Sequence, residues 1–263
     1  MPGMSTPTPA DIWASSDYAP TAARLRPAAL AVAEEVAARV RSGAHVLDLG
    51  AGHGQGAAKL VARGFRVTAL DPTPAMVEIG RARVPEADWV LADGEHTGLE
   101  DGAVEAIASS FAAMFCDPCA GPAEWARVLA PGGTLVMTAW DGRGFLAEMT
   151  DRMSAAVAPA GQAPHTPPHM QWAQDGVAAE RLGPWFADVS VEHRDLTWDF
   201  PSVEAGMTLY LEGSPTHTWS LAMAGDRRQA LLEALRGHLE ECAGQDGAIR
   251  SSAGYAMITA TRR

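Results

Sequence analysis

A short stretch of this chain combines glycines with an acid, residue types that are suited to binding a ligand. In VLDLGAGHGQG, residues 46–56, Asp48 interrupts an apolar run and glycine then takes every second position from Gly50 to Gly56. Glycine permits backbone dihedrals and close approaches that a Cβ would block. The free N–H groups at the start of a following helix attract negative groups. The stretch therefore predicts a ligand site between a strand and a helix.

The glycine spacing separates two classes of ligand. A dinucleotide fingerprint, G-x-G-x-x-G, that starts at Gly50 and Gly52 needs its third glycine where this chain has Gln55. A pyrophosphate would also meet like charge at Asp48, two residues before Gly50. We therefore disfavour a nicotinamide-dependent oxidoreductase and expect a ligand with a cationic end.

The elements that must position this loop alternate between strand and helix over residues 44–140. Short apolar strands are predicted at HVLDLG, FRVTALD, WVLAD, VEAIASS and GTLVMTAW, and helices at AAKLVARG, TPAMVEIGRARV and WARVLAPGG. An alanine-rich helix over residues 21–41 precedes them. This rhythm favours a parallel sheet covered on both faces. After residue 140 we expect a loop at PAGQAPHTPPH, a bent strand at FADVSVEHRDLTWDF, a helical stretch that includes RRQALLEALRGHLEECAG, and a closing strand at YAMITATRR.

VLDLGAGHG resembles motif I of the class I S-adenosylmethionine-dependent methyltransferases, and ALDPTPAM, LADGE, IASSF and ARVLAPGGTLVMTAW follow in that family's order. The resemblance implies a Rossmann-like, seven-stranded, mostly parallel α/β sheet with helices on both faces and a helical cap insertion. It implies S-adenosyl-L-methionine as cofactor and S-adenosyl-L-homocysteine as product. The implied cofactor-binding residues are Tyr18, Asp48, Gly50, Ala51, Gly52, Gly54, Asp71, Pro72, Met76, Ala92, Asp93, Gly94, Ser109 and Ser110.

The resemblance also assigns roles to these positions. The Asp71 carboxylate would accept both ribose hydroxyls, Pro72 and Met76 would pack on the adenine, and Asp93 would bind the adenine amino group. Ser109 or Ser110 would contact the methionine part. Each acid also suits an ordinary turn, Asp93 in particular.

More narrowly, DYA, DPTPAM, SSFAAMF and TAW resemble bacterial small-molecule methyltransferases related to those of ubiquinone and menaquinone biosynthesis. His53 departs from the small residue usual in the loop, and we expect a backbone role there. The fourth strand lacks the Asn/Asp-Pro-Pro-Tyr motif, which argues against methylation of amide or nucleobase nitrogens.

The acceptor side carries no comparable pattern. Trp13, Met114, Trp172, Tyr210 and Trp219 are the predicted substrate-binding residues, with ordinary core packing as the alternative. His217 and His169 lead the candidates for a general base because they lie in the expected capping insertions. His165, His193 and His238 complete that set, and we expect His238 to be solvated in its charged helix.

Composition limits the partners and the compartment. The formal charge is −12, from 20 basic and 32 acidic residues, and no basic stripe is present to bind nucleic acid. No run approaches the ~20 apolar residues of a membrane helix. Three cysteines form no disulfide framework, and Cys116-x-x-Cys119 lacks a second pair for zinc. We expect a cytoplasmic protein without a metal, a monomer or homodimer.

These observations lead to one functional hypothesis and one alternative. We expect a single domain over residues 1–263, in which 1–42 form an N-terminal lid segment, 43–140 the cofactor-binding core, and 141–263 the capping insertions and final strands. The hypothesis is methyl transfer to an O, N or C atom of a small, partly apolar metabolite, either a quinone precursor or a secondary metabolite. The alternative is a cyclase or isomerase that keeps this fold and binds the cofactor without transferring methyl.

Overall fold

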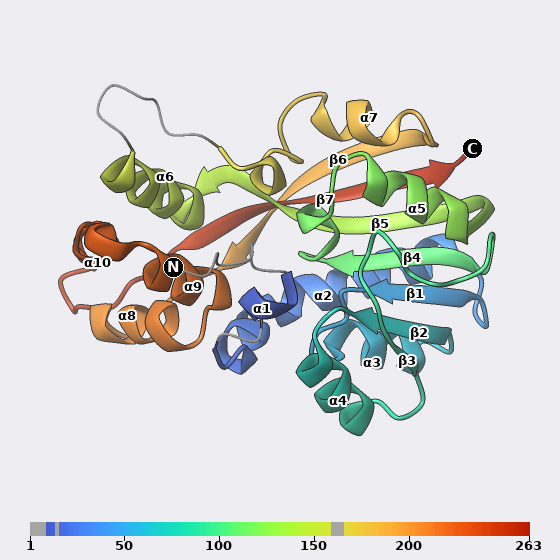
Figure 1. The fold of residues 1–263 in the computed structure, drawn as a ribbon, viewed down its shortest axis with the longest axis horizontal. Helices are drawn as coiled ribbons and strands as arrows, with labels where there is room; N and C mark the ends of the chain where they lie inside the picture. The colour runs from blue at the N-terminus through green and yellow to red at the C-terminus, as the bar shows by residue number, and fades with distance from the viewer. Residues whose placement is uncertain (1–8, 14–15, 159–165) are drawn as a thin grey trace, which may run out of the picture.

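The computed structural model describes residues 9–13, 16–158 and 166–263. Its centre is a seven-stranded sheet in the order β3-β2-β1-β4-β5-β7-β6 (Figure 1). The strands are β1 His45–Leu49, β2 Arg66–Asp71, β3 Asp88–Leu91, β4 Val104–Ser110, β5 Leu129–Gly144, β6 Phe186–Thr197 and β7 Ser252–Arg262. The predicted fold class, a mostly parallel Rossmann-like sheet, is confirmed.

The sheet has a parallel part and an antiparallel part. Strands β1 to β5 pair in parallel, whereas β7 pairs antiparallel with both β5 and β6. The parallel strands are short and apolar because helices cover both of their faces. Their carboxyl ends consequently meet along one edge, at which Leu49, Asp71, Leu91 and Ser110 are the last strand residues.

Helices cover both faces of the sheet and extend beyond one end of it (Figure 1). The α-helices are α1 Pro9–Trp13, α2 Ala19–Arg39, α3 Gln55–Ala62, α4 Pro74–Arg83, α5 Ala120–Val128, α6 Phe145–Val157, α7 Val177–Leu182, α8 Val203–Glu212, α9 Pro215–Met223 and α10 Arg228–Cys242. Short 3₁₀ helices are η1 Ala113–Phe115, η2 Pro168–Met170 and η3 Gly225–Arg227. The helix predicted to start at residue 21 begins two residues earlier, with Pro20 in its first turn.

Two hydrophobic cores lie on opposite sides of the sheet. One joins α2, α3 and α4 to the strands through side chains such as Val36, Leu60 and Val77. The other contains α5, α7 and the segments that follow β5, with Trp125 and Leu182 fully buried. The two layers hold the strand ends in a fixed relation, which the site at that edge requires.

Helices α6, α8, α9 and α10 gather at one end of the sheet and form what we call the helical cap (Figure 1). Leu235 and Leu239 of α10 are fully buried, and Gly206 of α8 approaches so closely that a Cβ there would lie 2.6 Å from a Leu239 methyl. The prediction of a solvated His238 is wrong. Its side chain is fully buried, its Nε2 lies 3.0 Å from the Phe145 carbonyl oxygen, and its ring packs on Phe145. His238 lies on the inward face of α10 together with the two leucines. It is therefore buried, although many of its neighbours in the sequence are charged.

The remaining expectations are met in part. The bent strand is β6, whose register shifts between Ala187 and Ser190, where Asp188 adopts a φ of +52°. The closing strand is β7, but it is buried on both faces and not alternately. Most of the expected loop at residues 159–169, with the candidate His165, lies outside the described residues. Within the described part of the chain, no helix is long and apolar enough to cross a bilayer.

Candidate active site

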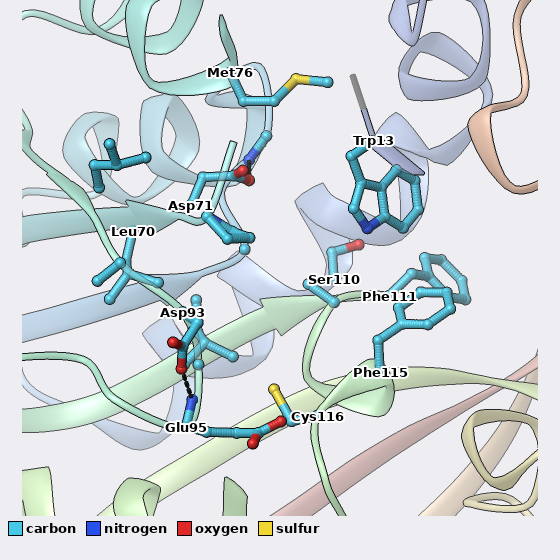
Figure 2. Close-up of a pocket in the computed structure, with 18 of the residues that line it drawn as sticks. Trp13, Leu70, Asp71, Met76, Asp93, Glu95, Ser110, Phe111, Phe115 and Cys116 are labelled. Atoms are coloured by element: carbon cyan, nitrogen blue, oxygen red, sulfur yellow. Dashed lines mark hydrogen bonds between the residues drawn. The ribbon is translucent and has the colours of Figure 1, made fainter. Parts of the chain in front are cut away.

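A cavity of about 420 Å³ opens at the carboxyl edge of the parallel strands (Figure 2). Its volume falls in the range of about 300–1,000 Å³ that is usual for small-ligand pockets. Its lining residues come from α1, from the start of α2, and from the ends of β1 to β4: Trp13, Tyr18, Leu49, Gly50, Gly52, Leu70, Asp71, Pro72, Met76, Leu91, Ala92, Asp93, Gly94, Glu95, Ser110, Phe111, Ala112, Phe115 and Cys116.

The glycine loop after β1 forms one wall of this cavity with its backbone. Gly50 has a φ of +73°, and a Cβ added there would lie 2.0 Å from the Ala112 Cβ, so only glycine fits. Gly52 also lines the cavity, whereas Ala51 and Gly54 are not among its lining residues. Gly54, with a φ of +82°, is the residue from which α3 starts.

Asp71, the last residue of β2, faces the cavity and is nearly buried. Its Oδ2 accepts a hydrogen bond from the Gly52 N–H at 2.9 Å, and its Oδ1 accepts one from the Thr73 N–H at 2.9 Å. Burial raises the pKa of this carboxyl, and the two backbone hydrogen bonds oppose that rise. Asp71 thus fixes the glycine loop and retains lone pairs on both oxygens that a ligand can use.

Asp48, which was expected to contact a cationic ligand, is buried and is not among the residues that line the cavity, so that contact stays a prediction. A Cβ at Gly56, in the first turn of α3, would lie 2.9 Å from the Asp48 Oδ2, which explains that glycine. Burial raises the pKa of Asp48 to about 7, and the backbone of Ala57 opposes that rise. The buried Oδ2 has no hydrogen-bond partner among the described residues.

The end of β3 contributes an acidic turn to the cavity. The lining includes Ala92, Asp93 and Gly94, which were predicted to bind the cofactor. It also includes Glu95, which sequence reasoning missed. The Asp93 Oδ1 accepts the Glu95 N–H at 2.8 Å, so the ordinary turn role of this acid exists beside its place in the lining. Leu91 is 55% exposed, which is unusual for a strand residue of this size and leaves an apolar surface at the mouth.

The two serines that end β4 differ in their surroundings. The Ser109 hydroxyl donates to the Leu49 carbonyl at 2.8 Å and accepts the Ala113 N–H at 2.9 Å, away from the cavity. Ser109 is not among the residues that line the cavity, and its cofactor contact stays a prediction. Ser110 lines the cavity, and its buried hydroxyl has no partner among the described residues. An orphaned buried hydroxyl in a cavity wall is a group that a ligand would satisfy.

Aromatic side chains close the other end of the cavity. The Trp13 ring meets the Tyr18 ring at 5.6 Å and the Phe115 ring at 5.4 Å, both edge to face. Phe111 and Phe115 were missed as site residues, although SSFAAMF had been singled out. The signal available was their position directly after a strand that ends in the site. Burial with neighbouring acids raises the pKa of the Cys116 thiol, also missed, to about 12.

Comparison with known proteins agrees with this geometry. A family model described as a methyltransferase domain matches residues 47–137. An uncharacterized methyltransferase of Mycobacterium tuberculosis (strain H37Rv) is 42% identical over 98 residues, which are 37% of this chain and 40% of that protein. The demethylmenaquinone methyltransferase of Beutenbergia cavernae is 38% identical over 98 residues, 37% of this chain and 41% of that protein. These matches thus span about two fifths of the relatives' own length.

Two longer likenesses extend the match. An uncharacterized protein of Mycobacterium tuberculosis (strain CDC 1551) is 30% identical over 195 residues, 72% of this chain and 69% of that protein. The crystal structure of the YcgJ protein of Bacillus subtilis superposes with a TM-score of 0.58 at 15% identity, covering 90% of this chain and 99% of that one. The chain belongs to the class I S-adenosylmethionine-dependent methyltransferases.

Within this methyltransferase, the residues predicted for the acceptor side are mostly core residues. Trp172 is fully buried and its Nε1–H donates to the carbonyl of Met114, which is itself buried, at 3.2 Å. The Tyr210 hydroxyl accepts the Trp198 Nε1–H at 2.9 Å in a second buried cluster. Neither these three predicted residues nor Trp219 line the cavity, so their role as substrate walls stays a prediction. Only Trp13 of that set lies in the lining.

The candidate bases of the methyltransferase also lie outside the lining. His217 is in helix α9 and not in a loop, since Pro215 occupies the first turn of a helix there. Its Nδ1 lies 2.8 Å from the Ser214 hydroxyl, and burial lowers its pKa to about 4. The His169 ring packs on the Phe115 ring with 4.8 Å between their centroids, and burial lowers the pKa of His169 too. His193 binds Asp141 on β5.

His53 has a more specific environment than the backbone role expected of it. Its side chain is buried, and its ring meets the Tyr18 ring edge to face at 5.4 Å. Burial lowers the pKa of His53 and, with Asp71 nearby, raises that of Tyr18. His53 therefore supports a lining residue from behind. No cluster of three metal-binding side chains occurs among the residues that the structure describes.

Proposed function

We propose that this protein transfers the methyl group of S-adenosylmethionine to a small, partly apolar acceptor. The observation that carries the proposal is the juxtaposition of the Asp71 carboxylate, the glycine-loop backbone and the unsatisfied Ser110 hydroxyl around one cavity. Family membership supports the same reaction class.

The lining fits the cofactor part by part. Asp71 has one further lone pair on each carboxylate oxygen, which suits the two adjacent hydroxyls of a ribose. Met76 and the exposed Leu91 offer apolar surface to an adenine, with Asp93 at its edge. Ser110 and Tyr18 would hold the methionine part beside the glycine loop.

When bound, S-adenosylmethionine supplies a methyl group that its sulfonium already activates. The chain's own contribution is then to position the acceptor and to exclude water, which are the main sources of acceleration for such a transfer. A general base is needed only where the acceptor atom must lose a proton in the step. This accounts for a site whose positioning groups are evident while no histidine of the described residues lies in its lining.

For the acceptor we propose an O, N or C atom of a quinone precursor or a secondary metabolite. The likeness to a protein named demethylmenaquinone methyltransferase supports the first class. Described charged residues of the lining are Asp71, Asp93 and Glu95, all acidic, which supports a small molecule over a nucleic acid. Three free cysteines support a cytoplasmic setting. We further propose one domain with the segment boundaries given above.

Calorimetry and a labelled-methyl assay test this proposal together. We expect binding of S-adenosylmethionine and S-adenosylhomocysteine and none of NAD. With tritium in the cofactor methyl, label should appear in extractable products when a panel of small phenols, quinols and amines is supplied. Acceptor conversion with all label left on the cofactor would support the cyclase or isomerase alternative. Binding of NAD alone would overturn the proposal.

A further inference from the structure

The two ends of the cavity differ in chemical character. Figure 2 shows Asp71, Asp93 and Met76 on one side and Trp13, Phe111 and Phe115 on the other, with Ser110 between them. The first side matches the polar groups of the cofactor, as argued above. The second side consists of ring faces and edges, so it must hold something else.

Phe111 keeps its place at the aromatic side through a strained backbone. Its φ is +56°, a left-handed backbone region that is unfavourable for a residue with a Cβ. Three contacts hold it there: its N–H donates to the Thr138 hydroxyl at 3.0 Å, its ring stacks on Trp140 at 4.0 Å, and Tyr255 meets it edge to face. A strained conformation fixed from several directions marks a residue whose orientation matters to the site.

The aromatic side contains no charge that could pair with a charged acceptor. None of the described lining residues is basic, so an anion would be buried without a partner. His169 packs on Phe115 but does not line the cavity, and burial lowers its pKa, which favours the neutral imidazole. The carboxylates of Asp71 and Asp93 lie toward the opposite side in Figure 2, where the proposed function assigns them to the cofactor, so they are not free to pair with a cationic acceptor.

We infer that the acceptor is an uncharged molecule with a flat ring, bound against Trp13, Phe111 and Phe115. This inference rests on the proposed function and names the substrate class for the same cavity. Ring–ring contacts of this kind stabilise a bound ring beyond what the burial of its apolar area contributes. An anion of the same size loses this advantage, because its charge must leave water without gaining a cationic partner in the cavity.

Three bicyclic probes of matched size and different charge test the inference. Calorimetry on the protein saturated with S-adenosylhomocysteine compares 2-naphthol, 2-naphthoate and 2-naphthylmethylammonium at neutral pH. We expect 2-naphthol to bind at least about tenfold more tightly than 2-naphthoate, and more tightly than the ammonium. Equal or tighter binding of either ion, or no binding of 2-naphthol, overturns the inference.

A substitution tests where 2-naphthol binds. Phe115→Leu should weaken the binding of 2-naphthol by about two- to tenfold and leave the affinity for S-adenosylhomocysteine unchanged. The matched control is Trp185→Leu, because Trp185 is an aromatic residue that is 46% exposed and outside this cavity. Equal loss in both variants would overturn the location. If the unaltered protein does not bind S-adenosylhomocysteine, the proposed function is refuted. Failure of the inference and failure of the proposed function are therefore distinguishable.

Discussion

The carboxyl edge of the parallel strands and the segments after β5 contrast in what their most conspicuous residues do. At the edge, Asp71 and Ser110 turn polar groups into the cavity. After β5, Trp172 and Tyr210 turn large apolar groups into the core, where each is almost completely buried. Both pairs were candidates for ligand contact, and only the first pair lines the cavity.

The difference follows from what each side chain requires. A carboxylate or hydroxyl at the end of a buried strand needs a polar partner, and the space beyond the strand is where a ligand can supply one. A tryptophan or tyrosine gains from burial in any apolar surroundings, so its presence in a capping segment says little about a substrate. Position at a strand end is therefore informative, and aromatic character in a variable segment is not.

The largest effect that would test this contrast is expected for Trp172→Ala. Loss of a fully buried indole should lower the free energy of unfolding by about 3–5 kcal/mol, measured by urea denaturation. The folded protein should still bind S-adenosylhomocysteine within about twofold of the parent, because Trp172 is outside the lining. The exposed Trp185→Ala serves as control, with a change of about 0.5 kcal/mol or less. Lost cofactor affinity at unchanged stability would break the comparison.

Asp71→Ala should act in the opposite sense. It removes hydrogen bonds to a charged acceptor that are worth about 1.5–3 kcal/mol each, so the affinity for S-adenosylhomocysteine should fall more than about tenfold in calorimetry. The variant also frees the Gly52 N–H, which loosens the loop. Asp175→Ala removes an exposed acid elsewhere and should change nothing. An unaltered dissociation constant for Asp71→Ala would reduce Asp71 to a turn residue.

Asp48 allows a test of the comparison by pH, because it lies near the carboxyl edge of the sheet but is buried outside the cavity lining. Burial raises its pKa from the ordinary 3.8 to about 7 in the folded protein, so between these values the folded state binds more protons than the unfolded one. Stability should therefore fall as pH rises through this window, at up to about 1.4 kcal/mol per pH unit. Asp48→Asn should lack this contribution. Urea denaturation at several pH values gives the difference, and a difference that stays constant with pH would contradict the assignment.

The smallest effect is expected for His217→Gln. Burial already holds the pKa of His217 near 4, so it stays neutral throughout the physiological range. The pH profile of methyl transfer should keep its shape, with a rate within about twofold. A displaced limb of the profile, or a rate reduced more than tenfold in a stable variant, would bring α9 into the reaction and weaken the contrast.

Much of the fold follows from the sequence because strand ends, glycines and helix starts are local signals. The alternation over residues 44–140 predicts the parallel strands and the helices between them, and VLDLGAGHG predicts the loop along the cavity. What pattern does not determine is which of two adjacent residues faces inward. Ser109 and Ser110 alternate across the strand, and only the packed sheet decides that Ser110 reaches the cavity.

Other misses had a signal that went unused. Ser214-Pro215 is an ordinary helix start, which places His217 in α9. His238 falls at helical spacing from Leu231 and Leu235, on the apolar face of α10. Phe111 was missed although it directly follows a strand that ends in the site, and its positive φ cannot be read from its identity.

The position of β7 also constrains the order in which the nascent chain can assemble. Strand β7 lies between β5 and β6, although β6 precedes it in synthesis and residues 198–251 separate the two. While those residues leave the ribosome, β6 has no partner strand and exposes a backbone edge. The five parallel strands are paired with one another without β7, so this part of the sheet can form first during translation. Insertion of β7 then docks β6 and closes the loop that carries α8, α9 and α10, a long-range step that we expect to be slow.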